Sequence, residues 1–150
     1  MSNLERIKNI LSEQIRECRK LLEILQKERQ RLVNLESSGV EALSKEKDTV
    51  VLKLRLLEEE RVRLLSAFAG GSGMAADISL KGLYEKTGDG AFMDLRCQLI
   101  SLVQSITELN EFNRILIERS LSAVSSSIGF FDSFGLDVHN GKGAVISREI

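Results

Sequence analysis

The chain has 150 residues, the length of one domain, and contains no proline, no tryptophan and one tyrosine. This composition favours long uninterrupted helices over a strand-rich fold, which would need more turn residues. The net charge is -1, and acidic and basic residues are interspersed over positions 1–66, so no face is built for nucleic acid.

The first predicted helix covers residues 2–35, where apolar side chains recur at alternating steps of three and four residues. This spacing is typical of a coiled-coil seam, in which Gln14 and Glu28 are polar interruptions. Ser2 or Asn3 is suited to capping the start of the helix. The apolar seam consists of Leu4, Ile7, Leu11, Cys18, Leu21, Leu25, Leu32 and Leu35.

A second helix is predicted over residues 40–68, directly after Gly39, a residue suited to ending the first helix. Lys47 and Arg61 stand at positions of its apolar stripe. The short connection makes the second helix an antiparallel neighbour of the first. The stripe itself consists of Leu43, Val50, Leu54, Leu57, Leu64 and Phe68.

A glycine-rich stretch, residues 69–76, is predicted to be a flexible connector between helices. A short helix over residues 77–87 follows it, and either Asp77 or Ser79 is suited to capping the start of that helix. Glycines shortly after this helix supply its stop signal. The chain is therefore expected to turn here before its last long element.

The third long helix is predicted over residues 91–131, and an irregular tail over residues 132–150. This helix is longer than either of the first two, which therefore need not cover all of it. Together the elements predict an all-α fold in a single domain, residues 1–150. We expect an elongated antiparallel helical bundle, or coiled coil, of three long helices and one short helix, with an irregular C-terminal tail.

Two asparagines, Asn110 and Asn113, interrupt the apolar stripe of the third long helix. Beyond them, residues 120–131 carry no charge, and serines serve as small polar spacers, which suits close approach by another helix. We predict that the asparagines mark a boundary between a bundle-facing part and a partner-binding part, where a buried amide would fix the helix register. The alternative is that both amides are simply solvated.

Catalytic and metal-binding chemistry has little support in the sequence. Cys18 and Cys97 lie far apart and form no CxxC motif, so reduced thiols are expected rather than a disulfide or a zinc site. His139 is the single histidine and lies in glycine-rich sequence, where a solvated side chain is the simpler interpretation. Residues 135–144 lack the spacing and the Ser or Thr of a phosphate-binding loop. We predict no enzymatic activity, no cofactor and no metal ion.

Membrane association is also not indicated. No run approaches the roughly 20 apolar residues of a membrane span, and the last helix lacks the basic residues expected for binding anionic lipid. Protein recognition therefore remains as the predicted class of function. The stripe beyond the asparagines could instead be ordinary bundle core or the seam of a homodimer, and the pattern alone leaves these alternatives open.

Four segments of the chain resemble the FlgN family, cytosolic export chaperones of the bacterial flagellar type III system. The first two are LLEILQKERQRLVNLE and ALSKEKDTVVLKLRLLEEERVRLL, and the last two are ISLKGLYEKTG and LNEFNRILIERSLSAV. The last segment is the most specific, because Leu109, Asn110 and Asn113 reproduce an LN-x-x-N pattern of the family. The resemblance extends over nearly the whole chain.

The resemblance implies a cytoplasmic chaperone that binds the C-terminal helical segments of the hook-filament junction proteins, the hook-associated proteins FlgK and FlgL. It would keep them unassembled and deliver them to the type III export gate, so the export apparatus is a further expected partner. The alternatives are a homo-oligomeric coiled-coil scaffold, or another helical secretion chaperone or export-apparatus component. Mapped onto this chain, the implied client-binding residues are Ile117, Leu121, Val124, Ile128, Phe130, Phe131 and Phe134.

Overall fold

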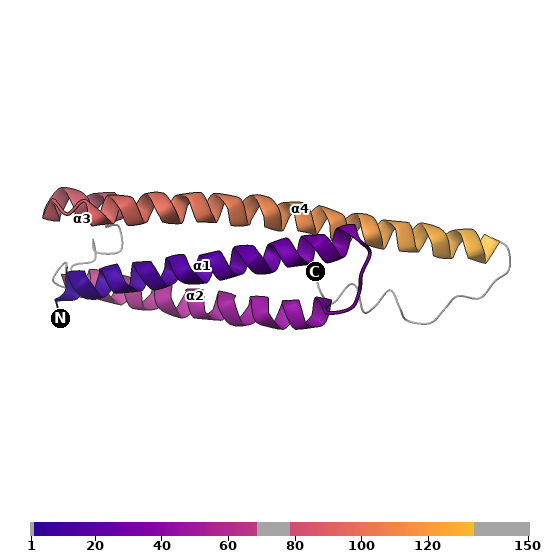
Figure 1. The fold of residues 1–150 in the computed structure, drawn as a ribbon, viewed down its shortest axis with the longest axis horizontal. Coiled ribbons are helices and arrows are strands. Elements are labelled where there is room, and N and C mark those ends of the chain that lie inside the picture. The colour runs from indigo at the N-terminus through magenta and orange to yellow at the C-terminus, as the bar shows by residue number, and fades with distance from the viewer. Residues whose placement is uncertain (1, 69–78, 134–150) are drawn as a thin grey trace.

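The structure, a computed structural model, describes residues 2–68 and 79–133 (Figure 1). Within these ranges it contains no strand, and its helices pack against each other, which confirms the predicted all-α bundle. The predicted connector at 69–76 lies outside the described residues, as do Asp77, Phe134 and His139. The helices are α1 (Asn3–Val33), α2 (Val40–Phe68), α3 (Leu80–Thr87) and α4 (Ala91–Ser133).

Local side-chain chemistry accounts for where two of the helices begin. The Ser2 hydroxyl accepts a hydrogen bond from the Glu5 N–H at 3.2 Å and so caps α1. The Ser79 hydroxyl does the same for α3, accepting from the Gly82 N–H at 3.1 Å. Of the two candidate caps at each start, serine therefore holds the position in both cases. The start of α3 lies at residue 80, whereas the sequence led us to expect residue 77.

Helix α1 ends at Val33, two residues before the position expected from its seam. The chain leaves the helix at Leu35, whose φ is 55°, in the left-handed region. The Leu35 N–H donates to the Leu32 carbonyl at 3.3 Å, and the Glu36 N–H donates to the Arg31 carbonyl at 2.8 Å. These are the two bonds of a Schellman motif, so the helix ends without Gly39.

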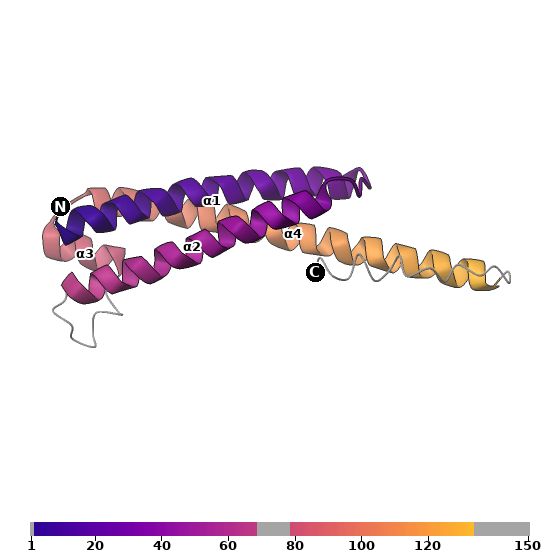
Figure 2. The same ribbon diagram turned by 90° about the horizontal axis from the view of Figure 1, so that it is seen from below.

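Helix α1 is the central element of the bundle, and α2 and α4 both pack along it (Figures 1 and 2). Helix α2 runs antiparallel to α1, and α4 runs in the same direction as α1. No Cα atom of α2 lies within 8 Å of a Cα atom of α4. Helix α3 packs on α4 at the end of the bundle where α1 begins. Helices α2 and α4 therefore share α1 as a common partner, and their backbones stay apart from each other.

Two clusters of buried apolar side chains hold the helices together. One lies at the end near α3, and the other lies toward the α1–α2 turn. Burying one such side chain stabilises the fold by about 1.5 to 3 kcal/mol. The first cluster contains Ile7, Leu11, Leu64, Leu65, Leu83 and Phe92. The second contains Leu21, Ile24, Leu25, Leu43 and Val50, with Ile106 and Leu109 of α4 packed against it.

Polar residues within the α1 seam fix the register of α1 against α2. The Gln14 side-chain amide donates to the Glu58 carboxylate at 2.9 Å. Further along α1, the buried Glu28 carboxylate pairs with the Lys47 ammonium at 3.6 Å. The two polar interruptions of the seam thus meet polar partners on α2. Because a slipped pairing would leave these buried groups without partners, they favour one register.

Candidate functional site

Helix α4 continues beyond the α1–α2 turn, as both views of the fold show (Figures 1 and 2). Asn113 contacts α1 at Leu25 and Glu28, and α1 ends five residues after Glu28, at Val33. Helices that run in the same direction advance equally per residue, so α1 reaches only to about residue 118 of α4. We call residues 119–133 the projecting segment; it is about 22 Å long.

The predicted client-binding residues lie mostly on the projecting segment. Leu121 and Ile128 are partly exposed there, and Phe130 is 58% exposed. Ile117 is also partly exposed and lies beside the last turn of α1. Val124 and Phe131 belong to α4, but their side chains are not among those described, and Phe134 lies beyond the described residues. The structure thus places four of these seven side chains, at or beyond the end of α1.

Apart from Arg119 and Asp132 near its ends, the polar side chains of the projecting segment are serines, and two of them bond within their own helix. The Ser127 hydroxyl donates to the Ala123 carbonyl at 2.9 Å, and the Ser133 hydroxyl donates to the Phe130 carbonyl at 2.6 Å. Residues 120–131 contain no charged side chain. A partner can therefore cover this surface without stripping water from an ion.

The two asparagines of the α4 stripe have different environments. Asn113 is buried, and its side-chain nitrogen donates to the Leu25 carbonyl at 2.9 Å and to the Glu28 carboxylate at 3.0 Å. Glu28 of α1 also pairs with Lys47 of α2, so Glu28 connects all three long helices. Asn110 is exposed instead. One amide thus contacts the bundle near the end of α1, and the other faces outward.

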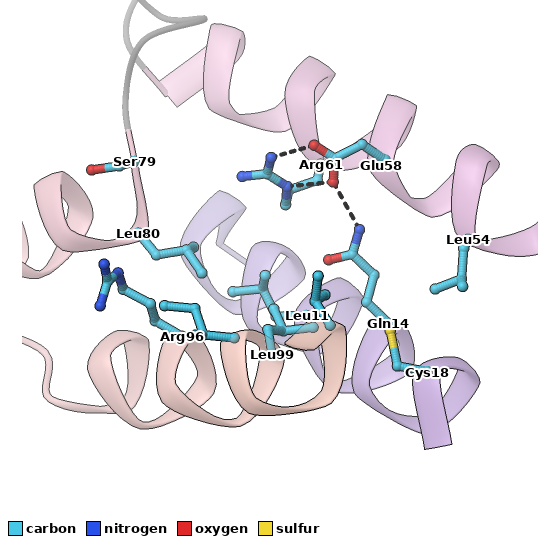
Figure 3. A pocket seen from close by; sticks show the side chains of 12 residues that line it. Leu11, Gln14, Cys18, Leu54, Glu58, Arg61, Ser79, Leu80, Arg96 and Leu99 are labelled. Atoms are coloured by element: carbon cyan, nitrogen blue, oxygen red, sulfur yellow. Dashed lines mark hydrogen bonds and ion pairs between the residues drawn. The ribbon is translucent and has the colours of Figure 1, made fainter. Parts of the chain in front are cut away.

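A groove of about 480 Å³ lies between α2 and α4 on one side of α1 (Figure 3). Its floor comes from α1, its walls come from α2 and α4, and Ser79 and Leu80 close one end. The floor residues are Leu11, Gln14 and Cys18, and the α2 wall consists of Leu54, Glu58 and Arg61. The α4 wall consists of Arg96, Leu99, Ile100 and Val103.

Charge on the α2 wall of this groove is neutralised locally. The Arg61 guanidinium donates to the Glu58 carboxylate, with the Nε to Oε2 bond at 2.8 Å. This bond, aided by the Gln14 amide, holds the pKa of Glu58 below its usual range. In the floor, burial raises the pKa of the Cys18 thiol, so the thiol stays protonated and unreactive. The groove therefore offers an apolar surface rather than reactive groups.

Sequence reasoning missed this groove, because it assigned the third helix a single stripe. The signal was present, since Arg96, Ile100 and Val103 follow at steps of four and three residues along one flank of that stripe. What the sequence did not contain was the separation of α2 from α4. That separation leaves the flank uncovered.

Within residues 2–68 and 79–133, no group of three or more His, Cys, Asp or Glu side chains could hold a metal ion. A search of the same residues found no helix with the length and apolar character needed to cross a membrane. The groove and the projecting segment are two apolar surfaces in the described part of the chain. Both are suited to contact with protein.

Comparison with known proteins identifies the family of this chain. The family model described as FlgN protein matches residues 1–134, a range that includes all four helices, the groove and the projecting segment. Neither the curated proteins nor the solved structures contained a match. The family match covers nearly the whole chain, so this protein belongs to the FlgN family of flagellar export chaperones.

Proposed function

We propose that this protein is a cytoplasmic chaperone of the flagellar type III export system, with the hook-filament junction proteins FlgK and FlgL as its clients. It binds their C-terminal helical segments, keeps them unassembled and delivers them to the export gate. Membership of the FlgN family supports the general role. The choice of clients and the binding surface on α4 are the parts that need testing.

The observation that best supports the proposed binding surface is that α1 packs along only part of α4. The face of α4 that packs on α1 through Ile106, Leu109 and Asn113 continues beyond the end of α1. There the flank of this apolar stripe that also carries Asn110 presents Leu121 and Ile128, both partly exposed. An amphipathic client helix can lie on this face much as α1 does, with its apolar side chains inserted between those of α4.

The mechanism of such a chaperone is competition for a helix surface. A subunit that assembles through an amphipathic helix is blocked while that helix is covered. The chaperone must also release the client helix at the export gate. Leucine, isoleucine and self-bonded serine side chains provide contact without buried ion pairs, which suits an affinity set by modest apolar burial.

A homo-oligomeric scaffold is the second candidate, and one observation favours it. Leu52 and Leu56 of α2 are exposed on the side that faces away from the groove, so a second copy could pack there. Light scattering on the client-free protein checks this candidate. A stable oligomer that persists in the Leu121→Asp variant would favour the scaffold over an open binding surface.

Calorimetric titration with purified C-terminal fragments of FlgK and FlgL tests the proposal. We expect Ile128→Asp to weaken binding at least tenfold, or about 1.4 kcal/mol, because a carboxylate would be buried in the apolar contact. Ser122→Asp is the matched control, since it adds the same charge on a side of α4 that holds neither Ile128 nor Phe130. It should leave binding nearly unchanged.

Helicity and melting temperature should stay the same in both variants, because the projecting segment lies beyond α1 and α2. If Ile128→Asp unfolds the isolated protein, this stripe is core and the assignment is wrong. If the fragments bind equally well to both variants, the clients do not use this face.

A further inference from the structure

The bundle has a vacant position opposite α1 among its described helices. In a four-helix bundle each helix touches two neighbours, and the diagonal pairs stay apart. Helices α2 and α4 both pack on α1, but their Cα atoms stay more than 8 Å apart. They are therefore related as a diagonal pair, with α1 at one corner between them. No described helix occupies the remaining corner, which is where the groove lies (Figure 3).

The walls of the groove expose apolar side chains toward this corner. Val103 and Ile100 of α4 are 51% and 39% exposed, although both line the groove. On α2, Val51 lies one helical turn before Leu54 of the groove wall and is also exposed. The groove is thus apolar on both sides, and a helix placed between the walls would bury these residues.

Charge in the groove indicates the chemistry of its occupant. Arg61 is committed to Glu58. Arg96, on the opposite wall, forms no hydrogen bond or ion pair with any residue in the described part of the chain. A guanidinium at the edge of an apolar groove pairs well with a carboxylate, because covering the groove lowers the local dielectric. The occupant is therefore expected to carry an acidic side chain beside its apolar stripe.

The groove is continuous with the projecting segment along α4. At about 100° per residue, Val103, Asn110, Ile117 and Leu121 fall within roughly 40° of each other around the helix. Val103 lines the groove, and Leu121 lies on the projecting segment. The exposed Asn110 lies between them on the same face. A single straight helix laid along α4 would therefore meet both surfaces.

We propose that the groove is the second half of the client site and that the bound client helix extends along α4 from the projecting segment into the corner opposite α1. The client helix carries an apolar stripe and an acidic side chain that pairs with Arg96. It completes a four-helix arrangement with α1, α2 and α4. This inference rests on the proposed function, because it assigns the occupant of the groove to the same client.

Titration of the full-length protein with the C-terminal fragments of FlgK and FlgL tests the inference through two variants and their controls. Val103→Asp should weaken binding at least tenfold, whereas Ser101→Asp, exposed on another side of α4, should not. Arg96→Glu should weaken binding threefold or more, and the loss should shrink at high salt. Arg16→Glu is its control, the same charge reversal at an exposed position on the side of α1 that faces away from the groove.

The outcomes separate this inference from the proposed function. If Val103→Asp and Arg96→Glu bind normally while Ile128→Asp does not, the client uses only the projecting segment and the groove assignment is wrong. If all three bind normally, both surface assignments are wrong, and if the unaltered protein binds neither fragment, the proposed function itself fails.

Two client-free measurements reveal other occupants of the groove. An oligomer that Val103→Asp disrupts in light scattering would mean that a second copy fills the groove. A lower melting temperature of a monomeric Val103→Asp variant would mean that the chain's own residues cover it. Either result overturns the inference.

Discussion

Helix α4 has one periodicity and two environments. In its bundled part, Phe92 is fully buried among side chains of α1, α2 and α3, and Asn113 is 1% exposed where it bonds to α1. In the projecting segment, Leu121 and Ile128 of the same stripe are partly exposed, and Phe130 beside the stripe is 58% exposed. An apolar stripe therefore does not by itself show whether its residues form the core or an exposed surface. The end of α1 decides which part of the stripe is core and which part is free for a partner.

Replacing a phenylalanine in each part gives the largest expected contrast. Phe92→Ala should lower the free energy of unfolding by about 3 to 5 kcal/mol, since it leaves a cavity in the cluster near α3. Phe130→Ala should change it by less than about 0.5 kcal/mol. Urea denaturation followed by circular dichroism measures both. A cost for Phe130→Ala close to that of Phe92→Ala would show that the projecting segment is packed in solution.

A second contrast concerns carboxylates inside and outside the bundle. Glu17 is buried, which opposes its ionisation, but hydrogen bonds from Lys53 and Lys20 outweigh this and hold its pKa below the usual range. Its folded pKa is the lower one, so its contribution to stability is present above the ordinary value of 4.5. That contribution is lost as the pH falls through the folded pKa.

Glu17→Gln should therefore lower the free energy of unfolding by about 1 kcal/mol at pH 7, and the difference from the parent should shrink below pH 4.5. Glu111 is the control. Arg114 lowers the pKa of its carboxyl, but Glu111 lies on the exposed side of α4, where solvent screens the pair. Glu111→Gln should leave the urea midpoint unchanged. Equal effects of the two variants would mean that Lys53 and Lys20 do not stabilise the bundle.

The fold was readable from the sequence because helical periodicity is a local signal. The seam of α1 and its polar interruptions at Gln14 and Glu28 follow directly from residue spacing. The partners of those residues, Glu58 and Lys47, depend on how α2 lies against α1. The end of α1 at Val33, two residues earlier than expected, was missed because the left-handed Leu35 that follows it has no local sequence signature.

The groove and the projecting segment were predictable from the sequence to different extents. The projecting segment lies where the loss of charge and the serine spacers indicated it. The groove depends on α2 and α4 staying apart, a property of the packing of three helices that no single stripe contains. Likewise, the sequence grouped Asn110 with Asn113, and only the position of α1 distinguishes the exposed amide from the buried one.

Asn113 lies near the boundary between the bundled part of α4 and the projecting segment. Its hydrogen bonds to α1 favour one register of α4 on α1. Its nitrogen donates twice to α1, but its side-chain oxygen is buried and accepts no bond from any described residue. A buried acceptor without a donor costs about 1 to 3 kcal/mol, whereas each donated bond contributes about 1 kcal/mol. The amide therefore adds little net stability. Its bonds to Leu25 and Glu28 nevertheless form at only one alignment of α4 on α1.

Asn113→Leu should consequently hold or raise the melting temperature, because the loss of two donated bonds is offset by the removed acceptor and the added apolar burial. Without the amide, alignments shifted along the apolar stripe become closer in energy. We expect a mixture of oligomeric states, or weaker discrimination between FlgK or FlgL fragments and an unrelated amphipathic helix. Asn110→Leu, at the exposed position, should preserve the alignment. A marked drop in melting temperature with discrimination intact would identify Asn113 as a stabilising residue only.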